Sequence, residues 1–207
     1  MALQPSLAPL VVAGDPTAPH TLDIFLDYTC PFSAKLALNG IQTVLAHKLS
    51  PRGQYAGKVK VIFRPQVQPW HSTSTLTHEA GLAVLRAAPE KFWEFSIALF
   101  KNQADYFDAP TLHLTTAQIR DSLIALAGTI ITPEQVEKVK GLLRLGEAHP
   151  NAGTAVVDDL KYTIKFSRQN GIHVSPTVLF DGLVANEISS GWGEEEWAKW
   201  LVAKVQA

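Results

Sequence analysis

The chain has 207 residues, 46% of them apolar, which is enough to bury one sizeable core. Its formal net charge of −1 provides no electrostatic attraction to nucleic acid or to an anionic membrane, so neither partner is expected. A single cysteine excludes an internal disulfide, and without an evident signal peptide or a run of roughly 20 apolar residues we expect a cytoplasmic protein.

The first predicted elements form a strand–helix–strand unit. Residues 21–28 alternate between apolar and polar side chains, which predicts a strand that leads into Cys30. Residues 58–67 are rich in Val, Ile and Phe and predict a second strand. Two strands joined through a helix pair in parallel in one sheet, so the chain begins as an α/β fold. The intervening helix has an apolar face formed by Ala34, Leu38, Ile41, Leu45 and Leu49.

The middle of the chain, residues 72–148, predicts a block of helices. Thr115 with Gln118 and Thr132 with Gln135 fit capping boxes, in which a hydroxyl and an amide satisfy free backbone groups at a helix start. The core of this block is expected to contain Phe92, Trp93, Phe95, Leu99 and Phe100.

Mixed structure returns in the C-terminal part. The pattern predicts a helix at 154–169 ended by Gly171, strands at 177–180 and 183–185 on either side of Asp181-Gly182, and a final amphipathic helix at 194–205. The apolar side of the helix at 154–169 is expected to be formed by Val157, Leu160 and Ile164.

Cys30 stands where the first predicted strand gives way to a helix. It can serve as the N-cap, with Pro31 at the first helical position. A lone cysteine is more often a buried, inert thiol. At this location, however, unpaired backbone N–H groups and the positive end of the helix dipole favour the thiolate, so we predict a reactive sulfur.

Ser175-Pro176 lies directly ahead of the predicted hairpin. Proline cannot donate to a sheet ladder, so a proline that opens a strand is unusual. A cis bond at this position would present the Ser175 backbone for pairing with an extended partner, and the alternative is an ordinary trans proline in a turn.

Taken together, these features resemble the thioredoxin-like superfamily and its DsbA-like family, with a Cys-Pro-Phe-Ser motif at residues 30–33. The stretch from Asp27 to Ser33 carries the resemblance, as do Pro69-Trp70-His71, Phe92-Trp93-Glu94-Phe95 and residues 99–103. The resemblance implies an α/β thioredoxin-like fold with a mixed central sheet. Residues 1–70 and 151–207 would form the thioredoxin-like domain, and residues 71–150 an inserted α-helical subdomain.

The resemblance also implies roles for individual residues. Cys30 would attack a disulfide and Ser33 would occupy the position of the resolving cysteine. Because a hydroxyl cannot release a mixed disulfide, an external thiol such as glutathione would have to do so. The residues expected to bind the substrate around the sulfur are Pro31, Phe32, Trp70, Ser175 and Pro176. Ile24 replaces the buried acid that many family members carry six residues before the nucleophile.

We therefore expect a monothiol thiol–disulfide oxidoreductase or isomerase that acts on a disulfide-containing protein or peptide, or on glutathione. It needs no tightly bound cofactor, and the sequence leaves its oligomeric state open. One alternative is an enzyme like the kappa-class glutathione transferases and isomerases, with Ser33 activating glutathione. Another is a non-catalytic binding protein that has kept the fold.

Other polar residues near the motif are expected to have structural roles. Asp27 is interpreted as a surface or loop-supporting carboxylate and is left out of the catalytic set. His71, His78 and Glu79 could resemble metal ligands, but helix spacing alone does not create a site, and no metal is expected. No glycine-rich nucleotide-binding loop is present.

Overall fold

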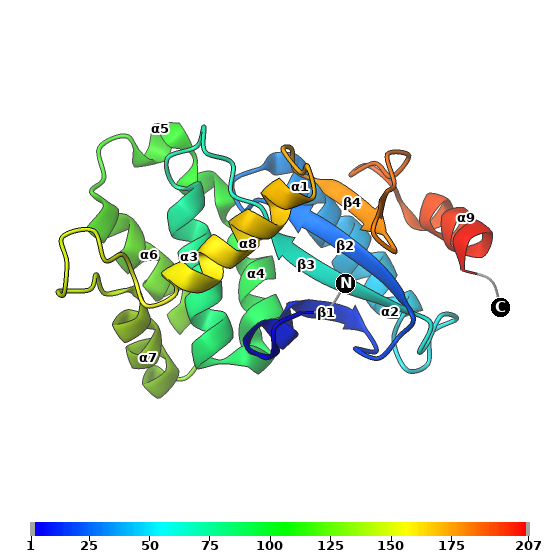
Figure 1. Cartoon of the computed structure of the whole chain (residues 1–207), viewed down its shortest axis with the longest axis horizontal. Coiled ribbons are helices and arrows are strands. Elements are labelled where there is room, and N and C mark those ends of the chain that lie inside the picture. The colour runs from blue at the N-terminus through cyan, green and yellow to red at the C-terminus, as the bar shows by residue number, and fades with distance from the viewer. Residues whose placement is uncertain (1–2, 206–207) are drawn as a thin grey trace. The chain divides into compact units, whose positions relative to one another are not determined.

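The computed structural model describes residues 3–205, and Figure 1 shows its elements. Contacts divide the chain into two compact units. The sheet unit comprises the residues up to Leu26, Cys30–Arg64 and the residues from Val174 onward, and the helical unit comprises Asp27–Thr29 and Pro65–His173. By these contacts the helical unit includes residues 27–29, 65–70 and 151–173 besides the predicted helical subdomain at 71–150.

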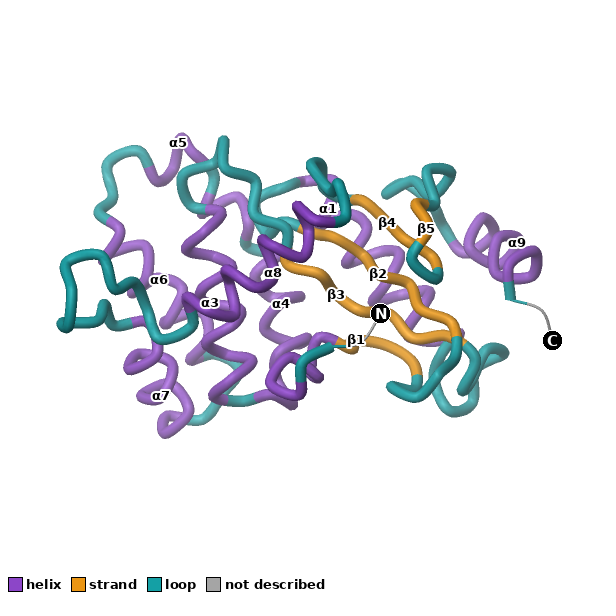
Figure 2. Tube along the Cα trace, viewed as in Figure 1, coloured by secondary structure: helices purple, strands orange, loops and turns teal. Residues whose placement is uncertain are grey.

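The sheet has five strands, which Figure 2 shows side by side: β1 (Val11–Gly14), β2 (His20–Leu26), β3 (Val59–Pro65), β4 (Thr177–Phe180) and β5 (Leu183–Val184). Their order is β1-β3-β2-β4-β5, with antiparallel pairing of β1 with β3, β2 with β4 and β4 with β5. The arrows of β2 and β3 point the same way in Figure 1, so the predicted parallel pair lies inside a mixed sheet.

β2 occupies the middle of the sheet and ends at Leu26, two residues earlier than predicted. Its side chains are buried on both faces after His20, although the alternating pattern suggests one polar face. Asp23 can be buried because its carboxylate accepts a hydrogen bond from Arg64 Nε of β3 at 2.7 Å.

A helix follows β2 in three parts: α1 (Pro31–Lys35), a π-helical stretch (Leu36–Leu45) and α2 (Ala46–Lys48). The π-helical bonding pattern turns Leu36 and Ala37 into the core and leaves the predicted core residue Leu38 half-buried. Gly40 allows a close approach, since a Cβ there would lie 3.2 Å from Trp197 Nε1 of α9 (Glu194–Lys204).

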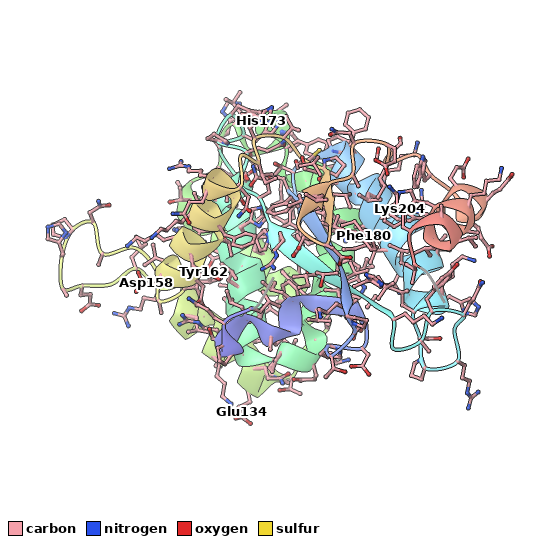
Figure 3. All side chains as sticks on the ribbon, turned by 45° about the vertical axis from the view of Figure 1, so that its right-hand side comes forward. Glu134, Asp158, Tyr162, His173, Phe180 and Lys204 are labelled. Carbon is pink, nitrogen blue, oxygen red and sulfur yellow. The ribbon has the colours of Figure 1, made fainter. Side chains whose placement is uncertain are left out.

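The hairpin between β4 and β5 forms as predicted. Asp181 and Gly182 both have positive φ, 49° and 86°, as a two-residue type I′ turn requires. The Asp181 carboxylate accepts a hydrogen bond from the Thr21 backbone N–H at 2.8 Å, which ties the turn to β2. Phe180, labelled in Figure 3, packs edge-on against Trp200 of α9 with ring centroids 5.0 Å apart.

The helical unit contains α3 (Ser74–Ala87), α4 (Phe92–Lys101), α5 (Asp108–Thr111), α6 (Thr116–Gly128), α7 (Pro133–Leu143) and α8 (Val157–Gln169). Four of the five predicted core aromatic and aliphatic residues are buried, and Trp93 is half-buried. Both predicted capping boxes form, at Thr115 and at Thr132. None of the helices in residues 3–205 combines the length and apolar character needed to cross a membrane.

Candidate active site around Cys30

Cys30 is the N-cap of α1. Its backbone is extended, with φ −92° and ψ 119°, and its carbonyl accepts the first helical hydrogen bond from Ala34 N at 3.0 Å. Pro31 takes the first helical position, where its missing N–H costs nothing. The sulfur therefore lies at the end of the helix where backbone N–H groups have no helical acceptor.

The Cys30 thiol donates a hydrogen bond to the Ser175 carbonyl oxygen, with Sγ 3.3 Å from that oxygen. The sheet register explains how residues 145 positions apart meet, because Phe25 of β2 pairs with Thr177 of β4. Cys30 follows the end of β2 and Ser175 precedes β4. Since the two strands are antiparallel neighbours, the end of β2 and the start of β4 lie side by side, and so do the residues next to them. The peptide bond between Ser175 and Pro176 is cis.

The other two residues of the motif differ sharply in exposure. Ser33, one turn along α1 from Cys30, is completely buried. Phe32 is 64% exposed and presents an apolar ring to solvent at the start of the helix. Cys30 itself is buried, with 6% of its surface exposed.

Trp70 belongs to the helical unit and is 58% exposed. Together with Pro69, Arg168 and His173 it lines a pocket of about 240 Å³ within that unit. The predicted position of Trp70 beside the sulfur stays a prediction.

Asp27 is fully buried and supports the loop before Cys30, as the loop-supporting interpretation expects. Its carboxylate accepts hydrogen bonds from Thr29 N at 2.6 Å, Gln68 N at 2.7 Å and the Ser74 hydroxyl. Burial alone would raise the pKa of this carboxyl, but the adjacent His78 ring and the hydrogen bonds from Ser74 and Thr29 lower it from 3.8 to about 2.

The three residues considered as metal ligands have other partners. His71 Nδ1 lies 2.8 Å from an Asp108 carboxylate oxygen, and Glu79 accepts hydrogen bonds from Arg120 and Thr154. His78 is buried, with Nε2 3.6 Å from Asp27 Oδ2. Within residues 3–205 no three His, Cys, Asp or Glu side chains come together as a metal site.

Comparison with known proteins places this geometry in a family. The model of the thioredoxin family Thioredoxin_4 matches residues 8–201. No curated protein sequence is significantly similar to the chain. Among solved structures, a Pseudomonas syringae protein proposed to be a protein-disulfide isomerase shares 27% identity with a TM-score of 0.67, and the match covers 91% of this chain and 96% of that one.

Two more distant structures share the fold. MdbA, a thiol-disulfide oxidoreductase from Actinomyces oris, is 20% identical with a TM-score of 0.61, covering 92% of this chain and 83% of that one. Chlamydia trachomatis DsbA is 16% identical with a TM-score of 0.62, covering 92% and 89%. The chain therefore belongs to the thioredoxin family and has the DsbA-like form of its fold.

Proposed function

We propose that the protein is a monothiol thiol–disulfide oxidoreductase or isomerase with Cys30 as its nucleophile. The observation that carries the proposal is the position of the sulfur, at the N-terminus of α1 and 3.3 Å from the Ser175 carbonyl oxygen. The helix start favours negative charge on the sulfur, and the neighbouring carbonyl provides a backbone acceptor for an extended partner.

The reaction begins when the Cys30 thiolate attacks one sulfur of a partner disulfide. A new S–S bond forms to Cys30, the partner's S–S bond breaks, and its second sulfur leaves as a thiolate. Ser33 has no sulfur with which to break this mixed disulfide. An external thiol attacks it instead, becomes joined to the partner and releases Cys30 as a thiolate. Glutathione is the external thiol that we propose.

The partner is a protein or peptide that carries a disulfide. The backbone of Ser175 pairs with the partner's main chain, and Pro31, Phe32 and Pro176 form the apolar surroundings of the attacked bond. Phe32 has the exposed ring that such a contact requires. We include Trp70 as a further substrate contact. The 27% identical structure proposed to be a protein-disulfide isomerase supports a partner of this class.

The complete burial of Ser33 disfavours the alternative in which its hydroxyl activates bound glutathione. Under that alternative, glutathione conjugation or isomerase turnover would survive the Cys30→Ala change. Under the non-catalytic alternative, partner proteins would be captured equally well after Cys30→Ser.

The test combines intact mass spectrometry with turnover. The reduced protein is incubated with oxidised glutathione, and we expect a single glutathione adduct that reduced glutathione removes. With glutathione as the reductant, the protein should also catalyse the reduction of a disulfide-bonded peptide. Cys30→Ala should lose both the adduct and the turnover.

A matched control is Asn39→Cys in the Cys30→Ala background, which places a thiol on an exposed position of the π-helical stretch. If this variant forms the adduct and turns over as fast as the wild type, the helix N-terminus confers nothing on the sulfur. Turnover that persists in Cys30→Ala would contradict the proposal.

A further inference from the structure

The three residues immediately before Cys30 pack in a different unit from their neighbours. Leu26 and Cys30 belong to the sheet unit, whereas Asp27–Thr29 makes its contacts within the helical unit. Asp27, Tyr28 and Thr29 are all buried, at 0%, 1% and 2% exposure. The segment that delivers the nucleophile is therefore held by side chains from the helical unit, and the covalent chain carries this restraint to Cys30.

Asp27 is the centre of this restraint. Its Oδ1 accepts from both the backbone N–H and the hydroxyl of Thr29, at 2.6 and 2.5 Å. Its Oδ2 accepts from the Ser74 hydroxyl at the start of α3 and from Gln68 N, two residues before Trp70. One carboxylate thus fixes the residue adjacent to Cys30 and the loop that carries Trp70.

Tyr28 secures the same segment on both sides. Its carbonyl accepts a hydrogen bond from Gln103 Nε2 at 2.8 Å, and its hydroxyl lies 2.8 Å from Ser96 Oγ of α4. The ring packs between His78 and Phe100, with centroid distances of 4.9 Å to each. The helical unit therefore holds Tyr28 through both its backbone and its side chain.

The His78 ring of α3 faces the buried carboxylate. Its side chain is 0% exposed, and in the described part of the chain neither ring nitrogen has a hydrogen-bond partner. Nε2 lies 3.6 Å from Asp27 Oδ2, which is too far for a hydrogen bond. In the hydrogen bonds described above, Asp27 is always the acceptor, so an ionised carboxylate suits the site better than a neutral amide.

We propose that Asp27 is a positioning residue for disulfide exchange at Cys30. Its carboxylate orders Asp27–Thr29 and thereby sets the direction from which the sulfur meets a disulfide, and through Gln68 N it orders the loop that carries Trp70. This role rests on the proposed exchange activity. It deepens that activity by naming the group that aligns the nucleophile without touching the reacting atoms.

The test compares two reactions of the same sulfur. Disulfide exchange requires the attacking sulfur to align with the S–S bond, whereas alkylation by iodoacetamide has a looser geometric requirement. For Asp27→Asn we expect the ratio of the oxidised-glutathione exchange rate to the alkylation rate to fall on the order of tenfold or more. Asn can accept from Thr29, but its NH₂ group faces the Gln68 N–H and breaks that link.

If Asp27→Asn does not fold, substitutions at Thr29 test the same proposal. Thr29→Val removes one hydroxyl donor to Asp27, and Thr29→Ser restores it, so the ratio should fall and then recover. Asp159→Asn is the matched control, because this carboxylate is also buried in the helical unit and pairs with Arg86 Nε at 2.7 Å. Its ratio should remain within twofold of the wild type at comparable loss of thermal stability.

The outcomes separate the two proposals. If the wild type alkylates but never exchanges with oxidised glutathione, the proposed function fails, and the positioning role fails with it. If the wild type exchanges and both Asp27→Asn and Thr29→Val keep its ratio, only the positioning role is refuted. If the ratio falls as far in Asp159→Asn as in Asp27→Asn, the positioning role is refuted as well, because the fall would then come from lost stability.

Discussion

Asp27 should make the free energy of unfolding of the protein depend on pH in the acid range. The pKa of the folded-state carboxyl is about 2, below its ordinary value of 3.8, so the ionised form is favoured by folding. This contribution is complete above the ordinary value and is lost as the pH falls through the folded-state value. Since a tenfold change in proton affinity corresponds to about 1.4 kcal/mol, the carboxylate contributes on the order of 2–3 kcal/mol at neutral pH.

Urea denaturation of the wild type and Asp27→Asn between pH 7 and pH 2 measures this contribution. The difference in unfolding free energy between the two proteins should be largest and constant above about pH 5, and should shrink by about 2 kcal/mol by pH 2, where the folded-state carboxyl is half protonated. His78 and Tyr28 are the titratable groups that face the carboxylate and remain in both proteins. Asp158→Asn, which removes an exposed carboxylate from α8, serves as the control and should leave the wild-type acid profile unchanged. If Asp27→Asn loses stability in acid as steeply as the wild type, the hydrogen-bonded carboxylate does not stabilise the fold.

Two further changes test the site and the packing beneath it. Ser33→Cys should supply the missing resolving thiol, so that the glutathione adduct on Cys30 gives way to an internal disulfide, seen by intact mass as the loss of glutathione; a persistent adduct would show that residue 33 cannot reach the mixed disulfide. Gly81→Ala would place a Cβ 2.8 Å from the Tyr28 hydroxyl and should destabilise the protein by about 1–3 kcal/mol in thermal or urea denaturation. Gly128→Ala, whose Cβ would lie an ordinary 3.6 Å from Val136 Cγ2, should cost little or stabilise, and equal losses for the two would contradict the packing argument.

Local signals in the sequence predict much of the fold. The Asp181-Gly182 turn and the caps at Thr115 and Thr132 depend on residues only a few positions apart, and the structure has all three. The helix after Cys30 is predicted in place, but its π-helical stretch is not, and this stretch changes the side chains that face the core. Apolar spacing assumes α-helical geometry, so it cannot reveal this change.

α8 shows a different limit of the apolar pattern. Val157 and Ile164, predicted to lie on the buried side, are only half-buried, whereas Asp159 and Ser167 are buried. Asp159 is buried because Arg86, 73 residues earlier in the chain, binds its carboxylate. A pattern confined to one helix contains no information about such a distant partner.

In the candidate site, too, features that depend on neighbouring residues can be predicted from the sequence, whereas contacts between distant residues cannot. The position of Cys30 at a helix N-terminus follows from neighbouring residues, and the resemblance pairs it with Ser175. The hydrogen bonds to Asp27 come from Gln68 and Ser74, which are 41 and 47 residues away. The sequence shows only that an acid precedes the motif by three positions, so its connection to the loop of Trp70 emerges from the fold alone.

The buried ion pair between β2 and β3 limits how the sheet can vary. Asp23 and Arg64 are 0% and 4% exposed, and neither charge can reach water if its partner is removed. Replacing one of them alone should cost about 3–5 kcal/mol, whereas exchanging both for apolar side chains of similar volume is often neutral or favourable. The two positions are therefore expected to change together, so that an engineered or divergent sheet keeps both charges or neither.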